Sequence, residues 1–255
     1  MLAEELIELH RSPREVAPFS ERYPGLSAAS GYSAARALHE HRVAQGWKPV
    51  GRKIGFTNRT LWARYGVHEP MWGTVYDRTL LFSQQSFCSV PLAGLVQPRI
   101  EPEICFKLKS APRPGRLVES IEWMAHAIEI VQCHHPAWKV SIADCTADNG
   151  LHGRLVVGSP IPLRDVDRLP EVEVKLFRDA KLIDRGTGAN VLGSPLLALG
   201  HLVELLERQP EAPPLAPGEI VTTGVLTDAH PVSAGETWST EVAGLPLQGL
   251  RVRFE

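Results

Sequence analysis

The stretch RIEPEICFKL, residues 99–108, places two glutamates two positions apart in an otherwise apolar run, with Pro102 between them. In an extended strand, successive side chains point to opposite faces, so Glu101 and Glu103 would lie side by side on one face. A solvent-facing strand would explain the pair, because charged side chains are mostly exposed. Since proline cannot donate to a sheet ladder, Pro102 predicts an edge or a bulge, where a ligand could reach both glutamates.

Two carboxylates on one face form half of a site for a hard divalent cation such as Mg²⁺ or Mn²⁺, which prefers oxygen ligands. A third acid is found in HAIEIVQC, residues 126–133. If this segment is a strand, Ile128 and Ile130 point into the core and leave Glu129 on the opposite face. A solvent-facing glutamate is the alternative at this position. The three acids are Glu101, Glu103 and Glu129.

The composition is that of an ordinary globular protein. The chain has 255 residues, 44% of them hydrophobic and 22% charged, and its formal net charge is −2. This charge gives no basic surface for nucleic acid, so we expect no nucleic-acid partner. The N-terminus has no apolar signal region, and no stretch approaches 18 uncharged apolar residues, so neither secretion nor a membrane association is expected. Four cysteines without a C-x-x-C pair favour a reducing cytoplasm.

Hydrophobic periodicity predicts helices near both ends of the chain and strands between them. Helical spacing covers MLAEELIELH, ended by Pro13, and residues 28–45, capped by Ser27 or Ser30. Residues 119–127 and 194–208 are also predicted to be helical. Short β-branched and aromatic runs fill much of the remainder, namely 50–57, 73–82, 99–108, 127–133, 153–158, 172–179, 219–226 and 250–254. The pattern favours an α+β, strand-rich fold, with a helical lobe at 1–48 and a β domain at 49–255.

Standard catalytic signatures are missing from the sequence. It contains no G-x-S-x-G, no Walker A loop and no H-E-x-x-H. The CHH run at 133–135 is a poor metal motif, because adjacent residues on a strand point to opposite faces. Nucleotide and serine-hydrolase chemistry are therefore not expected.

Seven blocks occur in an order that is more specific than any one of them. They are GRKIGFT (51–57), GVHEPMWGTVYD (66–77), RIEPEICF (99–106), IEWMAHAIEIVQ (121–132), ADNGLHGRLVVG (147–158), GTGANVLGSP (186–195) and GEIVTTGVLTDAHPVSAGE (218–236). Together they resemble the 2-keto-4-pentenoate hydratase and 4-oxalocrotonate decarboxylase group of the fumarylacetoacetate hydrolase superfamily. The resemblance covers about residues 45–255, and the first 45 residues match only loosely.

This resemblance implies a mixed β-roll with flanking helices, like the C-terminal domain of fumarylacetoacetate hydrolase. It implies a Mg²⁺ or Mn²⁺ ion held by acids that match Glu101, Glu103 and Glu129, and a pocket lysine that matches Lys53. It also implies an assembly of identical subunits. A decarboxylase and a hydratase of this group can form a complex, so a related enzyme is a possible partner.

Other site residues are weaker candidates with alternatives left open. Asp77 is either a catalytic acid near the metal or a turn cap. Gly188 and Ser194, in the glycine-rich run before the last helix, could bind a substrate carboxylate or simply form a loop and a helix cap. Thr223, or its neighbour Thr222, could hydrogen-bond the substrate or have a structural role.

The activity expected from the resemblance is that of a metal-dependent hydro-lyase. It would add water to a 2-hydroxy-2,4-dienoate to give a 4-hydroxy-2-oxo acid, as in aromatic meta-cleavage catabolism. A metal that polarises a 2-oxo acid serves decarboxylation equally well, so a 4-oxalocrotonate-type decarboxylase is the alternative. An acylpyruvate or fumarylacetoacetate-type C–C hydrolase is a further alternative, which would need a positioned water and a base.

Overall fold

The computed structural model describes residues 1–255, except for the side chains of Leu61, Arg64 and Tyr65. The helices are α1 (Leu2–Arg11), α2 (Phe19–Arg22), α3 (Ala28–Ala44), α4 (Trp62–Tyr65), α5 (Leu117–Ser120), α6 (Ile142–Ala147) and α7 (Pro195–Glu207), with short 3-10 turns that include η2 (Pro136–Trp138) and η3 (Asn149–Leu151). The strands are β1 (Pro49–Gly55), β2 (Met71–Tyr76), β3 (Leu80–Phe82), β4 (Phe87–Val90), β5 (Arg99–Leu108), β6 (Ile121–Val131), β7 (His152–Val157), β8 (Ile161–Pro162), β9 (Glu173–Arg178), β10 (Lys181–Thr187), β11 (Ile220–Thr222), β12 (His230–Pro231), β13 (Thr237–Ala243) and β14 (Arg251–Phe254).

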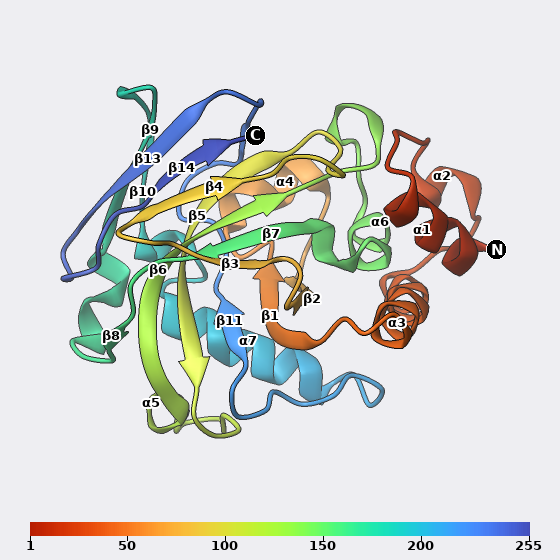
Figure 1. Ribbon diagram of the computed structural model, residues 1–255. Coiled ribbons are helices and arrows are strands. Elements are labelled where there is room, and N and C mark those ends of the chain that lie inside the picture. Colours follow the sequence, from red (N-terminus) through yellow and green to blue (C-terminus); the bar gives the residue numbers. More distant parts are fainter.

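The first three helices form a lobe beside the sheets, on the right in Figure 1. Ser27 caps α3, because its hydroxyl accepts a hydrogen bond from the Ser30 amide at 3.2 Å. The buried side chains Leu6, Leu9 and Phe19 pack with Ala147 of α6. Both N-terminal helices are thus confirmed, while the division into domains at residues 48 and 49 stays a prediction.

Two sheets build the rest of the molecule. The larger runs β2-β1-β11-β5-β6-β7-β3, with β12 added to β5 and β8 added to β6, and it contains parallel and antiparallel pairs. The smaller runs β10-β9-β13-β14-β4. The larger sheet curls around small buried side chains such as Cys105, Ala125 and Ala127. The predicted strand-rich α+β roll with a helical N-terminal segment is confirmed.

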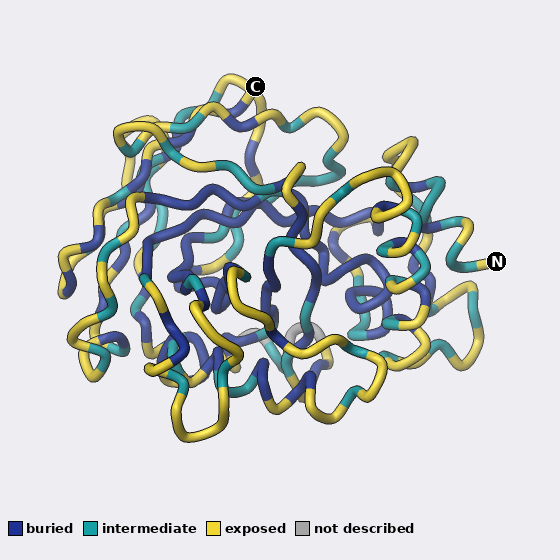
Figure 2. Tube along the Cα trace, turned by 60° about the horizontal axis from the view of Figure 1, so that its bottom comes forward, coloured by how far each residue is buried: buried dark blue, intermediate teal, exposed yellow. Residues whose placement is uncertain are grey.

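The convex face of the larger sheet carries the apolar residues of β5 and β6. Ile104 and Phe106 pack against α7, while Ile128 and Ile130 pack against the smaller sheet. The central strands are accordingly buried in Figure 2. The segment Gly188–Glu207 has the length and apolarity of a membrane span, but 56% of its tested window is buried inside the fold. Its apolarity is explained by packing in the core.

The predicted helix at 119–127 is wrong. Only α5, Leu117–Ser120, is helical there, and Ile121 begins the long strand β6. Trp123 and Ala125 pair with Lys107 and Cys105 of β5, so the whole segment completes a ladder. Helical propensity is a weak preference that such pairing overrides.

The prediction that Pro102 marks an edge or a bulge is also wrong, since β5 lies in the middle of the larger sheet and its register with β6 does not shift at Pro102. The ladder is interrupted locally instead: β11 pairs with residues 105–107 and β12 with 99 and 100. The segment that connects β11 to β12 leaves the sheet beside Pro102. In this segment, the Leu226 amide donates a hydrogen bond to the Pro102 carbonyl at 2.9 Å. The missing proline N–H therefore faces a gap in the ladder, where no partner strand needs it.

Candidate metal centre

The strand register brings the three glutamates together. Glu101 is the direct partner of Glu129 across β5 and β6, and Glu103 lies two residues further along the same face. Direct cross-strand partners have Cβ atoms about 5 Å apart. One carboxylate oxygen from each residue lies within 4.8 Å of the others. The predicted convergence of the acids is therefore present, and Glu103 and Glu129 are completely buried.

Each buried glutamate is held by a different element. Glu103 Oε2 accepts a hydrogen bond from the Gly224 amide at 2.7 Å. Glu129 Oε1 lies 2.7 Å from His152 Nδ1 at the start of β7. Lys53 Nζ, from β1, lies 3.3 Å from Glu129 Oε2. The carboxylates are thus fixed before any ligand arrives.

Gly224 is required by its conformation and by its close approach to a neighbour. Its φ is +99°, and a Cβ atom there would lie 1.8 Å from Thr57 Oγ1. Only glycine adopts this backbone region at no steric cost. Any side chain at position 224 would therefore displace the amide that binds Glu103.

The pKa values of the three glutamates are shifted in different directions. Burial raises the pKa of Glu101 to about 7, although Lys53 opposes this shift. Burial and the charges of the other two acids raise the pKa of Glu103 well above its usual range. Burial acts in the same direction on Glu129, but Lys53 and His152 outweigh it and lower its pKa. Without a cation, one lysine thus serves three competing carboxyl groups.

Lys53 stays positively charged in this setting. Burial alone would lower its pKa, but Glu129, Glu101 and Glu103 raise it above the ordinary value. Lys53 is therefore a counter-charge to the three acids in the metal-free site.

A small cavity of about 60 Å³ opens over Glu101 and Lys53. Its wall is mostly apolar, and it is lined by Lys53, Ile54, Gly55, Phe56, Thr57, Asn58, Met71, Glu101, Val131, Trp138, Val140, Gly150, Leu151, Gly224, Val225 and Ala229. Three bulky lining residues, Phe56, Trp138 and Leu151, have positive φ angles of 55°, 58° and 61°. Such backbone conformations are costly for large side chains and cluster at functional sites.

The structure does not bring the other predicted site residues to the acids. Asp77 is exposed, and its Oδ1 accepts from the Lys48 and Arg78 amides at 2.9 Å, as a turn cap does. Ser194 caps α7, and Gly188 packs against the Leu169 backbone. The Thr223 hydroxyl donates to the Ile104 carbonyl at 2.8 Å. Lys53 joins the cluster, while catalytic or binding roles for these other residues stay predictions.

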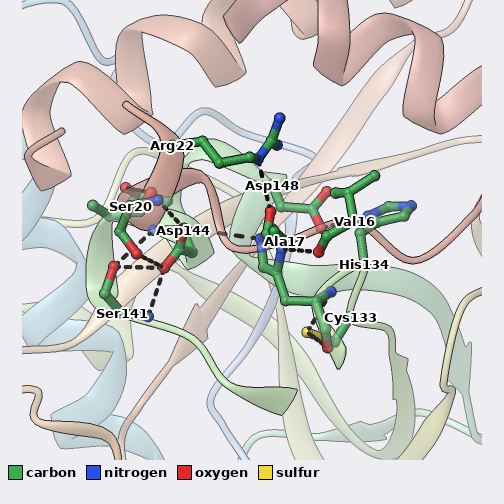
Figure 3. A network of polar contacts seen from close by, with 12 residues as sticks. Val16, Ala17, Ser20, Arg22, Cys133, His134, Ser141, Asp144 and Asp148 are labelled. Carbon is green, nitrogen blue, oxygen red and sulfur yellow. Dashed lines mark hydrogen bonds and ion pairs between the residues drawn. The ribbon is translucent and has the colours of Figure 1, made fainter. Parts of the chain in front are cut away.

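The wall formed by Gly150 and Leu151 is supported from the N-terminal lobe. Asp148 lies just before it, 2.8 Å from His10 Nε2 of α1 and 2.7 Å from His134 Nδ1. Figure 3 shows His134 and Asp148 beside a second contact, in which Asp144 accepts from the amide and hydroxyl of Ser20 at 2.8 and 2.7 Å. The helical lobe is therefore bonded directly to the segment that carries the cavity wall.

The sequence analysis did not predict that His152 contacts Glu129 or that the Gly224 amide contacts Glu103. His152 is 23 residues from Glu129 in sequence and meets it only through the β6–β7 pairing. The Gly224 amide meets Glu103 across 121 residues. The neighbouring threonines carried a local signal, since the TTG run at 222–224 lies inside the predicted strand 219–226.

Known proteins resemble this chain over most of its length. No family model matches the chain. It is 32% identical over 250 residues to a 2-keto-4-pentenoate hydratase of Burkholderia vietnamiensis (strain G4 / LMG 22486), an alignment that covers 96% of this chain and 93% of the relative. It is 33% identical over 215 residues to a 4-oxalocrotonate decarboxylase of a Pseudomonas species, covering 82% of this chain and 81% of the relative.

Solved structures resemble the whole chain. A 4-oxalocrotonate decarboxylase from Pseudomonas putida G7, complexed with magnesium and adipate, superposes with a TM-score of 0.91 and 25% identity, over 100% of this chain and 96% of that one. A fumarylpyruvate hydrolase from Pseudomonas aeruginosa, in complex with Mn²⁺ and pyruvate, superposes with a TM-score of 0.62 and 15% identity, over 80% of this chain and 88% of that one. The second likeness shows the fold alone.

Proposed function

The chain belongs to the 2-keto-4-pentenoate hydratase and 4-oxalocrotonate decarboxylase group of the fumarylacetoacetate hydrolase superfamily, and we propose that it is a metal-dependent hydratase. It would add water to a 2-hydroxy-2,4-dienoate to give a 4-hydroxy-2-oxo acid, in the catabolism of aromatic compounds. The observation that carries the proposal is the set of three carboxylates within 4.8 Å of one another, with Lys53 beside them. The relatives of that name support the reaction type.

The donor set fits a hard divalent cation. Among the described residues, Glu103 Oε1 and Glu129 Oε2 are buried without a hydrogen-bond donor, and Glu129 Oε2 lies 3.3 Å from Lys53 Nζ. Buried carboxylate oxygens without partners are costly, and a cation would satisfy them. Three carboxylates and water suit Mg²⁺ or Mn²⁺ better than softer ions. We propose that Glu101, Glu103 and Glu129 hold Mg²⁺ or Mn²⁺.

The bound ion would supply Lewis-acid stabilisation of the negative charge that develops on the 2-oxo oxygen. Lys53 would hold the substrate carboxylate, since its ammonium is kept protonated by the surrounding acids. The apolar wall of Val131, Trp138 and Val140 would receive the carbon chain and limit the entry of bulk water. The substrate would thus be oriented with its acid end at the glutamates and its alkene end toward the tryptophan.

Decarboxylation is the second candidate, because the same charge develops when CO₂ leaves a 2-oxo acid. The 33% identical relative carries that name. A C–C hydrolase is less well supported, since no histidine lines the cavity among the described residues. The nearby His152 is bonded to Glu129 and Thr79 through its two ring nitrogens. His68 and Glu69 also lie outside the lining.

A substrate panel tests the proposal. Metal-free protein is reconstituted with Mg²⁺ or Mn²⁺ and incubated with 2-hydroxypenta-2,4-dienoate, a 4-oxalocrotonate and an acylpyruvate, while ultraviolet absorbance and CO₂ release are followed. We expect loss of the dienol without CO₂. Release of CO₂ would identify the decarboxylase, cleavage of the acylpyruvate would identify the hydrolase, and turnover of none of the three would contradict the proposal.

We also propose a cytoplasmic homo-oligomer that can associate with a related decarboxylase or hydratase. The support is the group to which the chain belongs. Light scattering on the purified protein measures the number of subunits, and co-purification from the native source tests for the related enzyme. A monomer at micromolar concentration would contradict the first expectation.

A further inference from the structure

A second cavity, of about 560 Å³, lies between the N-terminal lobe and the larger sheet. Its walls come from α3, from β2 and from the chain at the end of α7 and just beyond it, toward the lower right of Figure 1. Most of the lining surface is apolar, and alanines and prolines contribute to it. Cavities of this size with an apolar wall and a few polar groups are typical binding sites for organic molecules.

The second cavity lies behind the metal centre, on the other side of β1. Arg52 and Lys53 are consecutive residues of this strand, so their side chains point to opposite faces. Arg52 lines the second cavity, while Lys53 lies beside the glutamates. Asn149 and Gly150 are divided between the two cavities in the same way. In the described part of the chain, the two cavities share no lining residue, so a ligand could bind here without entering the metal centre.

Arg52 carries the donor groups that indicate the class of ligand. Its side chain is only 4% exposed, and its Nη1 donates to Glu219 Oε1 at 2.8 Å and to the Gly51 carbonyl at 3.2 Å. Nε is buried without a hydrogen-bond partner, and Nη2 makes no hydrogen bond to any described residue. These two nitrogens form one edge of the guanidinium, whose parallel N–H groups match the two oxygens of a carboxylate. A buried donor without a partner costs free energy, which such a ligand would recover.

The guanidinium is held in place by an aromatic pair of the cavity wall. Its central carbon lies 5.5 Å from the centroid of the Trp72 ring, and Tyr32 stacks on Trp72 with ring centroids 5.3 Å apart. The indole N–H of Trp72 donates to Gln209 Oε1 at 2.9 Å. An arginine that is fixed in this way loses little freedom when it binds a carboxylate.

The other charged side chains of the lining lie at its rim, where water screens them. All of them are exposed, and four of the five form two ion pairs; they are Arg36 with Glu211, Arg208 with Glu69, and Glu40. Exposed ion pairs of this kind contribute little to binding or stability. The buried edge of Arg52 therefore decides which polar group the cavity accepts.

We propose that this cavity is a second ligand site, which binds an organic monocarboxylate with a bulky apolar body. The carboxylate is bound by Nε and Nη2 of Arg52, and the apolar body packs against the wall between α3 and the end of α7. The inference does not rest on the proposed function, because no residue of the metal centre takes part in it.

Two matched ligands test the inference without turnover. Calorimetry on the full chain compares adamantane-1-carboxylate with adamantane-1-carboxamide, which have nearly the same shape but differ in charge. Their cage is too bulky for the cavity of about 60 Å³ at the metal centre. We expect the carboxylate to bind about tenfold more tightly than the amide, the size of effect given by one charge-assisted bidentate contact. The preference should be the same with Mg²⁺ and with a chelator.

Replacement of Arg52 by lysine tests the donor edge. Arg52→Lys keeps a positive charge beside Glu219, but its single ammonium group leaves no second pair of donors for the ligand. The preference for the carboxylate should therefore fall to about twofold or less. Arg36→Lys, at the exposed rim of the same cavity, is the matched control and should keep the wild-type preference.

A variant that fills the cavity tests its location and also serves if Arg52→Lys does not fold. Ala29 is an exposed residue of α3 that lines the cavity, so Ala29→Phe fills space without disturbing the core. This variant should weaken the binding of both ligands by at least about tenfold. Ala44→Phe, exposed on the same helix but outside the lining, should bind both ligands like the wild type.

Equal affinities for the two ligands in the wild type, or a preference that survives in Arg52→Lys, would overturn the inference. A preference that disappears with the chelator would also overturn it, because the carboxylate would then be bound at the metal centre. Binding that is absent from the assembled protein and appears only in a monomer would show that a second copy of the chain covers the cavity instead.

Discussion

At the scale of single residues, the site is a set of like charges forced together by strand geometry. Glu101, Glu103 and Glu129 share one face of two paired strands, and burial raises the pKa of Glu101 to about 7. Isolated buried carboxylates would instead lose their charge or be replaced by apolar residues. The arrangement is therefore stable only with Lys53 nearby, and it favours a cation that can neutralise the remaining charge.

Replacement of Glu103 by glutamine should weaken metal binding by at least about tenfold, because one of three anionic ligands becomes a neutral amide. Isothermal titration with Mg²⁺ or Mn²⁺ measures the change. The metal-free variant should be as stable as the wild type, since the raised pKa of Glu103 already favours its neutral form.

The matched control is Glu122→Gln, on the same β6 strand as Glu129 but exposed to solvent. This variant should bind the metal like the wild type. An unchanged affinity in Glu103→Gln would show that Glu103 is not a ligand.

Replacement of Lys53 by methionine should cost about 3–5 kcal/mol of unfolding free energy in the metal-free protein, because a buried ion pair loses one partner. Chemical denaturation in the presence of a chelator measures the loss. Added Mg²⁺ should restore part of it, since a divalent cation can replace the lost positive charge. The surface lysine Lys175, paired with Glu241 at 3.5 Å, is the control, and Lys175→Met should change the stability by less than about 1 kcal/mol.

The three acids could be predicted from the sequence because each sits in a strand whose two-residue period is visible locally. The residues that hold them could not be predicted in the same way. His152 and the Gly224 amide meet Glu129 and Glu103 only after β7 and the segment behind β11 are placed in the sheet. Contacts of this kind depend on topology and leave no period in the sequence.

At the scale of elements, the strand pair β5–β6 decides the site and also explains the two errors in the sequence analysis. The first half of β6 has residues that suit a helix, but its ladder with β5 runs from Ile121 to Val131. Pro102 indicated an interruption correctly, yet the interruption is a gap between β11 and β12 rather than a sheet edge. Local propensity cannot distinguish these cases, because both depend on which strand is the neighbour.

The contact between the N-terminal lobe and the cavity wall predicts a stability that depends on pH. Burial would raise the pKa of Asp148, but the neighbouring His134 and His10 lower it far below its ordinary range. Its stabilisation is therefore present above the unfolded value of about 3.9 and lost as the pH falls. Burial would lower the pKa of His134, but Asp148 raises it. The stabilisation that comes from His134 is present below its unfolded pKa of about 6.5. It is lost as the pH rises through the higher pKa of His134 in the folded protein.

The pKa of His10 is lowered by burial and opposes the contribution of His134, so hydrogen exchange of residues 1–48 should show the clearest loss of protection as the pH falls below about 4. Asp148→Asn should remove most of this dependence and cost about 3 kcal/mol, because the negative charge and one of the two acceptor oxygens that face His10 and His134 are lost. Asp167→Asn, at an exposed position, is the control. Wild-type protection of the lobe in Asp148→Asn would contradict the proposed coupling of lobe and wall.

At the scale of the whole molecule, the site depends on segments from every part of the chain. Lys53, Glu103, Glu129 and His152 come from four strands, and Gly224 comes from the loop after β11, so the set spans residues 53–224. Because the site is assembled from distant segments, the order of the seven sequence blocks identified the family better than any single block did. A sequence that preserves all of these segments in order preserves the contacts between them. The fold class could thus be predicted, although individual partners could not.

Metal binding should therefore stabilise the complete fold rather than one segment. A cation that binds only the folded chain adds about 2.7 kcal/mol at a concentration one hundred times its dissociation constant. Thermal unfolding with excess Mg²⁺ and with a chelator measures this difference, which should fall to about 1.4 kcal/mol or less in Glu103→Gln and stay intact in Glu122→Gln. Because the pKa of Glu101 is about 7 and that of Glu103 is raised, protons compete with the metal, and its affinity should rise with pH from 6 to 8. Equal melting temperatures with Mg²⁺ and with chelator would show that these carboxylates do not form a metal centre.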